Sequence, residues 1–262
     1  MTASSIATLN KLPEVEKRPI YSRFIPSPLL ARYSVSPELR DAQGRELAHF
    51  TYAPGTTDVT LTLLHSVEAA DPLLFAHLTD TMNGQIYILL YILNDPHSPR
   101  FDVDRMPDGS PTQFGLSQRN LAAEEQSLAA GLAPGQVRRG VGMLRESVEA
   151  FESFIASLEH QVYFIDPLYY HNAVIFERYG FAYQKGRRRM EAYHAGFQPG
   201  GGWLRDRLDG SSPFRQPWMA DSIRGRSWAM HDGIADQVFT DVTMYKRLQD
   251  HAGIDTYPGG VW

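Results

Sequence analysis

The residues that most clearly suit ligand binding, by type and by spacing, are Leu132-Ala-Pro-Gly-Gln-Val-Arg-Arg-Gly-Val-Gly142. This segment leads into the strongest helical pattern of the chain. Glycine costs about 1 kcal/mol relative to alanine inside a helix, so Gly140 and Gly142 near a helix start need a compensating role. A helix N-terminus has unpaired N–H groups and a partial positive charge, which together bind anions. Arg138 and Arg139 add full positive charges. The segment therefore predicts a site for a phosphate or pyrophosphate group.

Other motifs that would bind phosphate, metal or an acyl group are absent from the sequence. No GxxxxGK[ST] pattern occurs, and no GxGxxG follows a predicted strand, which excludes a P-loop and a dinucleotide fingerprint. The histidines form no HxH, HxxxH or HExxH pair, and no GxSxG element supports a catalytic serine. We therefore expect no metal site and no hydrolase triad.

The same segment resembles the pyrophosphate loop of the GCN5-related N-acetyltransferase (GNAT) superfamily, V-x-P-x-x-[QR]-x-x-G-x-[GA]. In that family the loop follows a strand and opens a long helix. Leu132 takes the apolar position, Pro134 the proline position, and Gly140 and Gly142 the two glycine positions. Val137 departs from the Gln or Arg of the pattern, but the loop acts mainly through backbone amides.

A second stretch extends this resemblance. The family pattern is a strand followed by N-x-x-A-x-x-x-Y-E-K-x-G-F. Here Val162–Ile165 is the strand, and Phe176-Glu-Arg-Tyr-Gly-Phe181 corresponds to Y-E-K-x-G-F. The two motifs span residues 132–181, and a looser likeness in strand order reaches back to about Leu47. The resemblance implies a mixed α/β fold with a central, mostly antiparallel, splayed sheet flanked by helices.

The resemblance also implies a co-substrate, acetyl-CoA or another acyl-CoA, and transfer of the acyl group to an amine of a small molecule or peptide. In the family the strand before the loop splays from the strand after the helix, and the pantetheine arm lies in the opening. That strand would be 125–132, with pantetheine pairing near 131–133. The implied cofactor-binding residues are Leu132, Ala133, Val137, Arg138, Arg139, Gly140, Val141, Gly142, Met143, Asn172 and Phe176.

The proton donor for this transfer has more than one candidate. The family uses a tyrosine hydroxyl near the thiolate as general acid. One register places Phe176 at that position, and phenylalanine cannot donate a proton, so nearby Tyr169 is a candidate. A second register, anchored on Asn172, places Tyr179 there instead. A missing tyrosine would fit the alternative function, a non-catalytic protein that binds CoA, acyl-CoA or another small ligand on the same fold.

The candidate general base is Glu125, at the start of the implied strand. Strand alternation would turn either Glu124 or Glu125 toward the cleft. Local composition points the other way, because the Ala, Glu, Gln and Leu residues of 121–132 favour a helix. The family context requires a strand, and we expect it to override this weak local preference.

The elements that must position these residues are predicted from hydrophobic periodicity. A helix over 136–160 carries an apolar stripe at spacings of three and four residues. Strands are predicted within 46–53 and 58–66, which flank a Pro54-Gly55 turn, and at 85–94, 101–106 and 161–165. Further helices are predicted at 71–82 and 169–179, and a hairpin over 181–197 with its turn at Gly186.

Three regions are predicted along the chain. Residues 1–24 are expected to form a loosely attached arm, and 25–195 the acyltransferase-like domain. The extension 196–262 contains many Gly, Pro and aromatic residues, and we expect it to pack on that domain or on a second subunit. The second arrangement would form a homodimer. The acceptor pocket would come from variable loops such as 107–115 and from this extension.

Composition narrows the classes of partner. The chain has 262 residues, a formal net charge of −5 and no cysteine, which excludes disulfides, thiolate nucleophiles and Cys-ligated zinc. The acidic balance offers no overall attraction to nucleic acid or to an anionic membrane. The longest apolar run, Ile86 to Leu93, is far shorter than the roughly 20 residues of a spanning helix. We expect a cytoplasmic protein without nucleic-acid or membrane partners.

Overall fold

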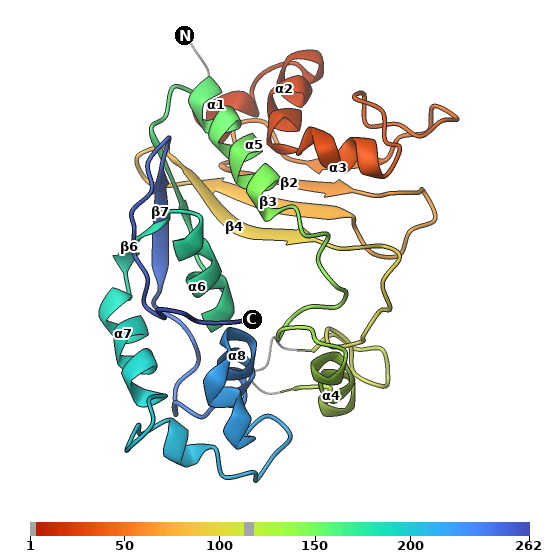
Figure 1. Cartoon of the computed structure of the whole chain (residues 1–262). Coiled ribbons are helices and arrows are strands. Elements are labelled where there is room, and N and C mark those ends of the chain that lie inside the picture. Colours follow the sequence, from red (N-terminus) through yellow and green to blue (C-terminus); the bar gives the residue numbers. More distant parts are fainter. Residues whose placement is uncertain (1–3, 113–117) are drawn as a thin grey trace. The chain divides into compact units, whose positions relative to one another are not determined.

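The computed structural model describes residues 4–112 and 118–262, and within them a mixed α/β fold (Figure 1). The strands follow the order β1-β2-β3-β4-β5-β7-β6. Strands β1 to β4 pair antiparallel, whereas β4 and β5 are parallel. The predicted class, a mixed α/β fold with a mostly antiparallel sheet flanked by helices, is confirmed.

The bounds of the elements are as follows. The strands are β1 (Ala48–Thr51), β2 (Asp58–Leu63), β3 (Leu74–Asp80), β4 (Ile86–Leu93), β5 (Val162–Ile165), β6 (Ala182–Lys185) and β7 (Thr243–Arg247). The α-helices are α1 (Ile6–Leu9), α2 (Glu14–Tyr21), α3 (Ser27–Arg32), α4 (Leu121–Ala129), α5 (Leu144–Ser157), α6 (Tyr170–Arg178), α7 (Arg187–Gly196) and α8 (Ile223–His231). Short 3₁₀ helices are η1 (Ser22–Phe24), η2 (Arg205–Arg207) and η3 (Pro217–Asp221).

The chain folds into two compact units, each assembled from three separate stretches. Unit 1 comprises Met1–His97, Gly140–Asp166 and Tyr245–His251. Unit 2 comprises Ser98–Arg139, Pro167–Met244 and Ala252–Trp262. This division differs from the predicted regions 1–24, 25–195 and 196–262, because segments far apart in the sequence pack together in each unit.

Unit 1 is built on strands β1 to β5 with helices over one face. Figure 1 shows α1, α2, α3 and α5 together on that face of β2, β3 and β4. The core between them is aromatic: Phe24 stacks on Phe151 with ring centroids 5.2 Å apart, and Phe154 meets Phe24 edge-on at 5.4 Å. The helix predicted at 136–160 is therefore present as α5, although it begins only at Leu144.

The predicted helix at 71–82 is wrong, because this stretch contains strand β3. Leu74 and Leu78 are four residues apart, which suits a helix face, but they also lie on one face of a strand. In the structure Leu74, Ala76 and Leu78 are all buried, with half-buried residues between them, and Met82 is fully exposed in the following turn. The true period of the pattern is therefore two.

The N-terminal segment, expected as a loose arm, is packed into unit 1. Its side chains Ile6, Leu9, Tyr21 and Phe24 are buried. The carboxylate of Asp80 accepts hydrogen bonds from the first backbone N–H groups of α1, at 2.7 and 2.8 Å. Apolar burial and this cap together attach the segment to strand β3.

Unit 2 contains α4, α6, α7, α8 and β6, and α8 packs on α6. Trp228 is fully buried in this unit and stacks on Phe214, with ring centroids 5.1 Å apart. The indole N–H of Trp228 donates to the carbonyl of Leu132 at 2.9 Å, which anchors the loop after α4. The aromatics of the predicted extension are thus partly buried within this unit.

Three predicted elements of unit 2 are corrected. The strand expected at 125–132 does not form, because 121–129 is helix α4, as local composition favoured. The stretch 101–106 forms turns and one isolated bridge, not a strand. The hairpin expected over 181–197 is strand β6 followed by helix α7, and Gly186 at their junction has a φ of +99° that favours glycine.

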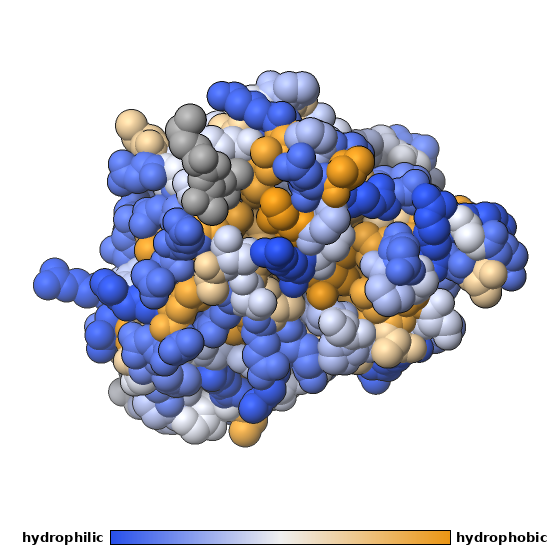
Figure 2. Space-filling model, turned by 90° about the horizontal axis from the view of Figure 1, so that it is seen from above, coloured by the Kyte–Doolittle hydropathy of each residue, from blue (hydrophilic) through white to orange (hydrophobic). Residues whose placement is uncertain are grey.

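Hydrophilic side chains predominate on the face shown in Figure 2, with hydrophobic residues exposed between them. Scattered apolar residues on a protein surface are ordinary and need no partner to explain them.

Candidate functional site

Strand β4 is paired unequally on its two sides in unit 1. On one side it pairs with β3 along its whole length, from Ile86 to Leu93. On the other side it pairs in parallel with β5 only at Tyr87↔Phe164 and Ile88↔Ile165. Beyond Ile88, the described residues provide no strand on this side of β4. The sheet therefore opens here and leaves a strand edge available for pairing.

The loop before α5 passes the end of this open edge. A Cβ atom added to Gly140 would lie 3.5 Å from the carbonyl oxygen of Leu93. Gly142 has a φ of +74°, and no heavy atom would lie within 4 Å of an added Cβ there, so the space beside it is open. The guanidinium of Arg32 donates to the carbonyl of Val141 at 3.0 Å and holds the loop against α3.

The backbone N–H groups of this loop and of the first turn of α5 have no protein acceptor. From Gly140 to Glu146, no N–H donates to another of the described residues, and Ser147 is the first that does, to Met143 at 3.0 Å. These amides lie at the positive end of a helix of 14 residues. Consecutive free amides at a helix N-terminus form a site for an anion such as phosphate.

The implied cofactor-binding residues are divided between the units. Gly140, Val141, Gly142 and Met143 belong to unit 1, at the site just described. Leu132, Ala133, Val137, Arg138 and Arg139 belong to unit 2, together with Asn172 and Phe176. The strand that was expected at 125–132, beside which pantetheine was predicted to pair near 131–133, is absent, and the strand edge that is open belongs to β4.

The unit 2 members of this set are engaged in local hydrogen bonds. The N–H of Ala133 donates to the side chain of Gln136 at 2.7 Å, and the carbonyl of Val137 accepts from Phe101 at 2.8 Å. Arg138 binds the carbonyl of Ser98 through its guanidinium, and the N–H of Arg139 donates to the hydroxyl of Ser98 at 3.2 Å. These contacts fix the loop 132–139 to the segment 98–101.

Asn172, Phe176 and Tyr179, the predicted residues along α6 and at its end, make local structural contacts. Asn172 accepts the N–H of Tyr169 at 3.1 Å through its side chain and caps the helix. Phe176 packs against Phe181 at 5.2 Å. Tyr179 ends α6, at the opposite end from Tyr169, so the two alternative acids do not share a position.

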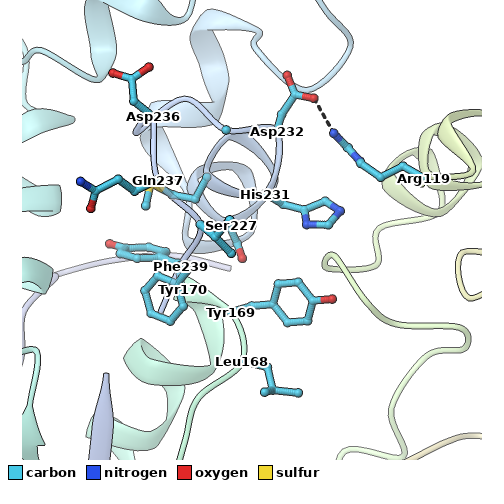
Figure 3. Close-up of a pocket in the computed structure, with 13 residues that line it drawn as sticks. Arg119, Leu168, Tyr169, Tyr170, Ser227, His231, Asp232, Asp236, Gln237 and Phe239 are labelled. Atoms are coloured by element: carbon cyan, nitrogen blue, oxygen red, sulfur yellow. Dashed lines mark hydrogen bonds and ion pairs between the residues drawn. The ribbon is translucent and has the colours of Figure 1, made fainter. Parts of the chain in front are cut away.

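Unit 2 contains a cavity of about 560 Å³, shown in Figure 3. It lies between the start of α6, the C-terminal half of α8 and the chain that follows α8. The residues that line it are Arg119, Leu168, Tyr169, Tyr170, Ser227, Met230, His231, Asp232, Gly233, Asp236, Gln237, Val238 and Phe239. Tyr169 is the predicted site residue among them. Residues 113–117, part of the predicted acceptor loop, lie outside the described residues.

A buried charge network borders this pocket. Arg119 donates to Glu124 at 2.9 Å and to Asp232 at 2.8 Å, and Nε2 of His231 lies 3.1 Å from the other oxygen of Glu124. Burial acts to raise the pKa of Glu124, but the hydrogen bonds from His231 and Arg119 outweigh it and hold this pKa below its ordinary value. Glu124 is therefore a carboxylate, whereas the predicted base Glu125 is exposed on α4.

A second buried pair lies beside the first. Nδ1 of His171 is 2.8 Å from the hydroxyl oxygen of Ser227. Burial, together with the neighbouring His231, lowers the pKa of His171 to about 3, so this imidazole is neutral. Burial and the charge of Glu124 raise the pKa of Tyr169 to about 12, so its hydroxyl keeps its proton.

Sequence reasoning missed these pairs. His231 and Glu124 are 107 residues apart, and His171 and Ser227 are 56 apart, so no short spacing joins either pair. The sequence feature that came nearest was the pair Glu124-Glu125. Strand alternation could not tell which of the two is buried, because the segment is a helix.

Three further findings are negative. Among the described residues, no cluster of three or more His, Asp or Glu side chains could hold a metal ion. Helices in the described part of the chain are all too short or too polar to cross a lipid bilayer. No known protein family, curated protein or solved structure matches the chain.

Proposed function

We propose that this chain is an acyl-CoA-dependent N-acyltransferase, which transfers an acetyl or other acyl group to an amine of a small molecule or peptide. The observation that carries the proposal is the juxtaposition of two features in unit 1: the open edge of β4 beyond Ile88, and the acceptor-less amides of Gly140–Glu146 beside its end. The resemblance of the loop sequence to the GNAT pyrophosphate loop supports the same function.

Each feature suits one part of acyl-CoA. The pyrophosphate carries the negative charge that free amides at a helix N-terminus attract. The pantetheine arm contains amide groups, which can pair with an open strand edge as an added strand would. The strand in this role is β4, in place of the segment 125–132 that the resemblance implied.

The transfer itself requires attack of a neutral amine on the thioester carbon, loss of the amine proton to a base and protonation of the departing thiolate. Tyr169, whose burial raises its pKa to about 12, keeps a proton to donate. Phe176, packed on Phe181, offers none. The assignments of Tyr169 or Tyr179 as the general acid and of Glu125 as the general base stay predictions.

Calorimetric titration of the purified protein with CoA tests the binding site. The informative variant is Gly142→Glu, which places a carboxylate among the free amides. We expect it to weaken CoA binding at least tenfold. The matched control is Gly44→Glu, because Gly44 also has a positive φ, +77° against +74° for Gly142, and neither glycine has an atom within 4 Å of an added Cβ.

Equal CoA affinity in the two variants would refute the site, and no binding of CoA to the wild-type protein would refute the proposed function. Turnover is measured separately, as free thiol released from acetyl-CoA in the presence of a panel of amines. Binding of CoA without turnover on any amine would favour the alternative, a non-catalytic protein that binds CoA or acyl-CoA.

A further inference from the structure

We infer that the pocket of unit 2 binds a small molecule that presents an amine or hydroxyl donor on an apolar or aromatic body, with Nδ1 of His231 as the acceptor. This ligand site is distinct from the acyl-CoA site proposed above. The inference holds whether or not unit 1 binds acyl-CoA, because every residue that it uses belongs to unit 2.

The hydrogen bond to Glu124 determines which nitrogen of His231 is available. A carboxylate only accepts hydrogen bonds, so Nε2 of His231, 3.1 Å from the Glu124 oxygen, carries a hydrogen. In the neutral ring Nδ1 then has the lone pair. Within the described residues nothing donates to Nδ1, and His231 lines the cavity. The pocket therefore contains a ring nitrogen, Nδ1 of His231, that pairs with none of the described residues.

The other ionic groups of the pocket are already occupied. Figure 3 shows Arg119 reaching Asp232, and the same guanidinium also binds Glu124. Asp232 accepts two further hydrogen bonds, from Arg215 and Ser212 at 2.8 and 2.9 Å. Of the described residues that line the pocket, Arg119 is the one with a guanidinium or ammonium group. Because Arg119 is already paired with Glu124 and Asp232, these residues offer no unpaired cation to bind a carboxylate or phosphate. The site thus favours a donor over an anion.

The remaining walls suit an apolar or aromatic body. Leu168, Met230 and Val238 supply aliphatic surface, and the Tyr170 and Phe239 rings meet edge-on at 6.4 Å. A volume of about 560 Å³ is within the range of pockets that enclose small organic ligands. Aromatic rings pack well against such mixed walls.

One wall is held rigidly. The Tyr169 ring stacks on His171 at 5.6 Å and meets His231 edge-on at 5.7 Å. Gly135 approaches this tyrosine so closely that an added Cβ would lie 2.5 Å from its ring and its hydroxyl. A fixed wall lowers the entropy cost of ligand binding, since little has to be ordered.

A purely structural role is the competing explanation, in which His231 only ties α8 to Glu124 of α4. The variant His231→Gln separates the two roles. Its side-chain NH2 can still donate to Glu124, but the ring nitrogen Nδ1 is replaced by a differently placed carbonyl oxygen. If the role is only structural, this variant should bind ligands as the wild-type protein does.

The test compares three probes that share one body: 3-phenylpropylamine, 3-phenylpropan-1-ol and 3-phenylpropionate. Binding is followed by ¹⁵N-histidine NMR without CoA. We expect His231 in the Nε2–H form, a shift of its Nδ1 signal with the amine and the alcohol, and little response to the carboxylate. His231→Gln should weaken amine binding about tenfold, the effect of losing one hydrogen bond to a charged group.

Three results would overturn the inference: the carboxylate binding as tightly as the amine, no loss of affinity in His231→Gln, or no binding of amine and alcohol at millimolar concentration. The Gly142→Glu variant should bind the amine as the wild-type protein does. If the wild-type protein binds the amine but shows no affinity for CoA, this site would be supported and the function proposed for unit 1 refuted.

Discussion

Acidification is expected to destabilise the protein through His171. The ordinary pKa of a histidine is 6.5, and burial lowers that of His171 to about 3 in the folded protein. Between these pH values the unfolded chain binds a proton that the folded protein does not. The stability contributed by the neutral side chain is therefore complete above pH 6.5, and it is lost progressively as the pH falls toward 3.

The magnitude follows from the linkage between protonation and folding. One proton of difference corresponds to about 1.4 kcal/mol for each pH unit. Over the interval from 6.5 to about 3, His171 alone would remove about 5 kcal/mol of unfolding free energy. This is a large part of the roughly 5 to 15 kcal/mol that is typical of whole domains, so the protein should be much less stable near pH 3 than at neutral pH.

The assay is urea unfolding at several pH values between 4.5 and 6, roughly the range in which the proton difference is complete. Tryptophan fluorescence reports on the transition, because Trp228 is fully buried. The comparison is His171→Gln, which keeps a polar partner for the Ser227 hydroxyl but does not titrate. The wild-type free energy should fall with decreasing pH more steeply than that of the variant, by about 1.4 kcal/mol per pH unit.

Equal slopes for the two proteins would refute this reasoning, even if the variant were less stable at every pH. Such a result would mean that His171 takes up its proton in the folded protein as easily as in the unfolded chain. A variant at an exposed histidine, His49→Gln, serves as the control for the substitution itself.

Three further predictions concern single side chains. Phe154→Ala, at a fully buried position, should lower the unfolding free energy by about 3 to 5 kcal/mol in urea titrations, and a loss below about 1 kcal/mol would contradict the packing described. Trp228→Phe removes an indole donor from a buried carbonyl and should cost about 1 to 3 kcal/mol, whereas Trp218→Phe, at a half-exposed position, should cost almost nothing. Arg32→Ala releases the loop before α5 and should weaken CoA binding severalfold in calorimetry without a comparable effect from the exposed Arg23→Ala; equal effects would argue against the loop's role.

The elements that could be predicted are those with one dominant local signal. Strand β4 is a continuous apolar run, the β1–β2 hairpin has a Pro-Gly turn, and α5 has a sustained stripe. The prediction for β3 was wrong because Leu74 and Leu78 fit both a helical and a strand period. At α4 the local composition predicted the helix that forms, whereas the strand implied by the resemblance at 125–132 is absent. Residues 94–139 separate the preceding strand, β4, from the loop before α5.

The candidate site was predictable where chemistry is local in sequence. Gly140 and Gly142 indicated an anion site because their backbone amides and the helix that follows lie within one short segment. The strand beside that segment, and the pairs His231–Glu124 and His171–Ser227, depend on contacts between distant residues. Periodicity and spacing carry no information about such contacts, so only the folded chain brings these groups together.

The interleaving of the two units bears on how this protein is made. Unit 1 ends with Tyr245–His251, and unit 2 begins at Ser98, so neither is a continuous piece of the sequence. During translation unit 1 cannot be completed until residue 251 has been synthesised. By then almost all of unit 2 has been synthesised as well. Dissecting the chain at any single peptide bond would therefore leave at least one unit incomplete, and a truncated fragment is a poor substitute for the intact polypeptide in every experiment above.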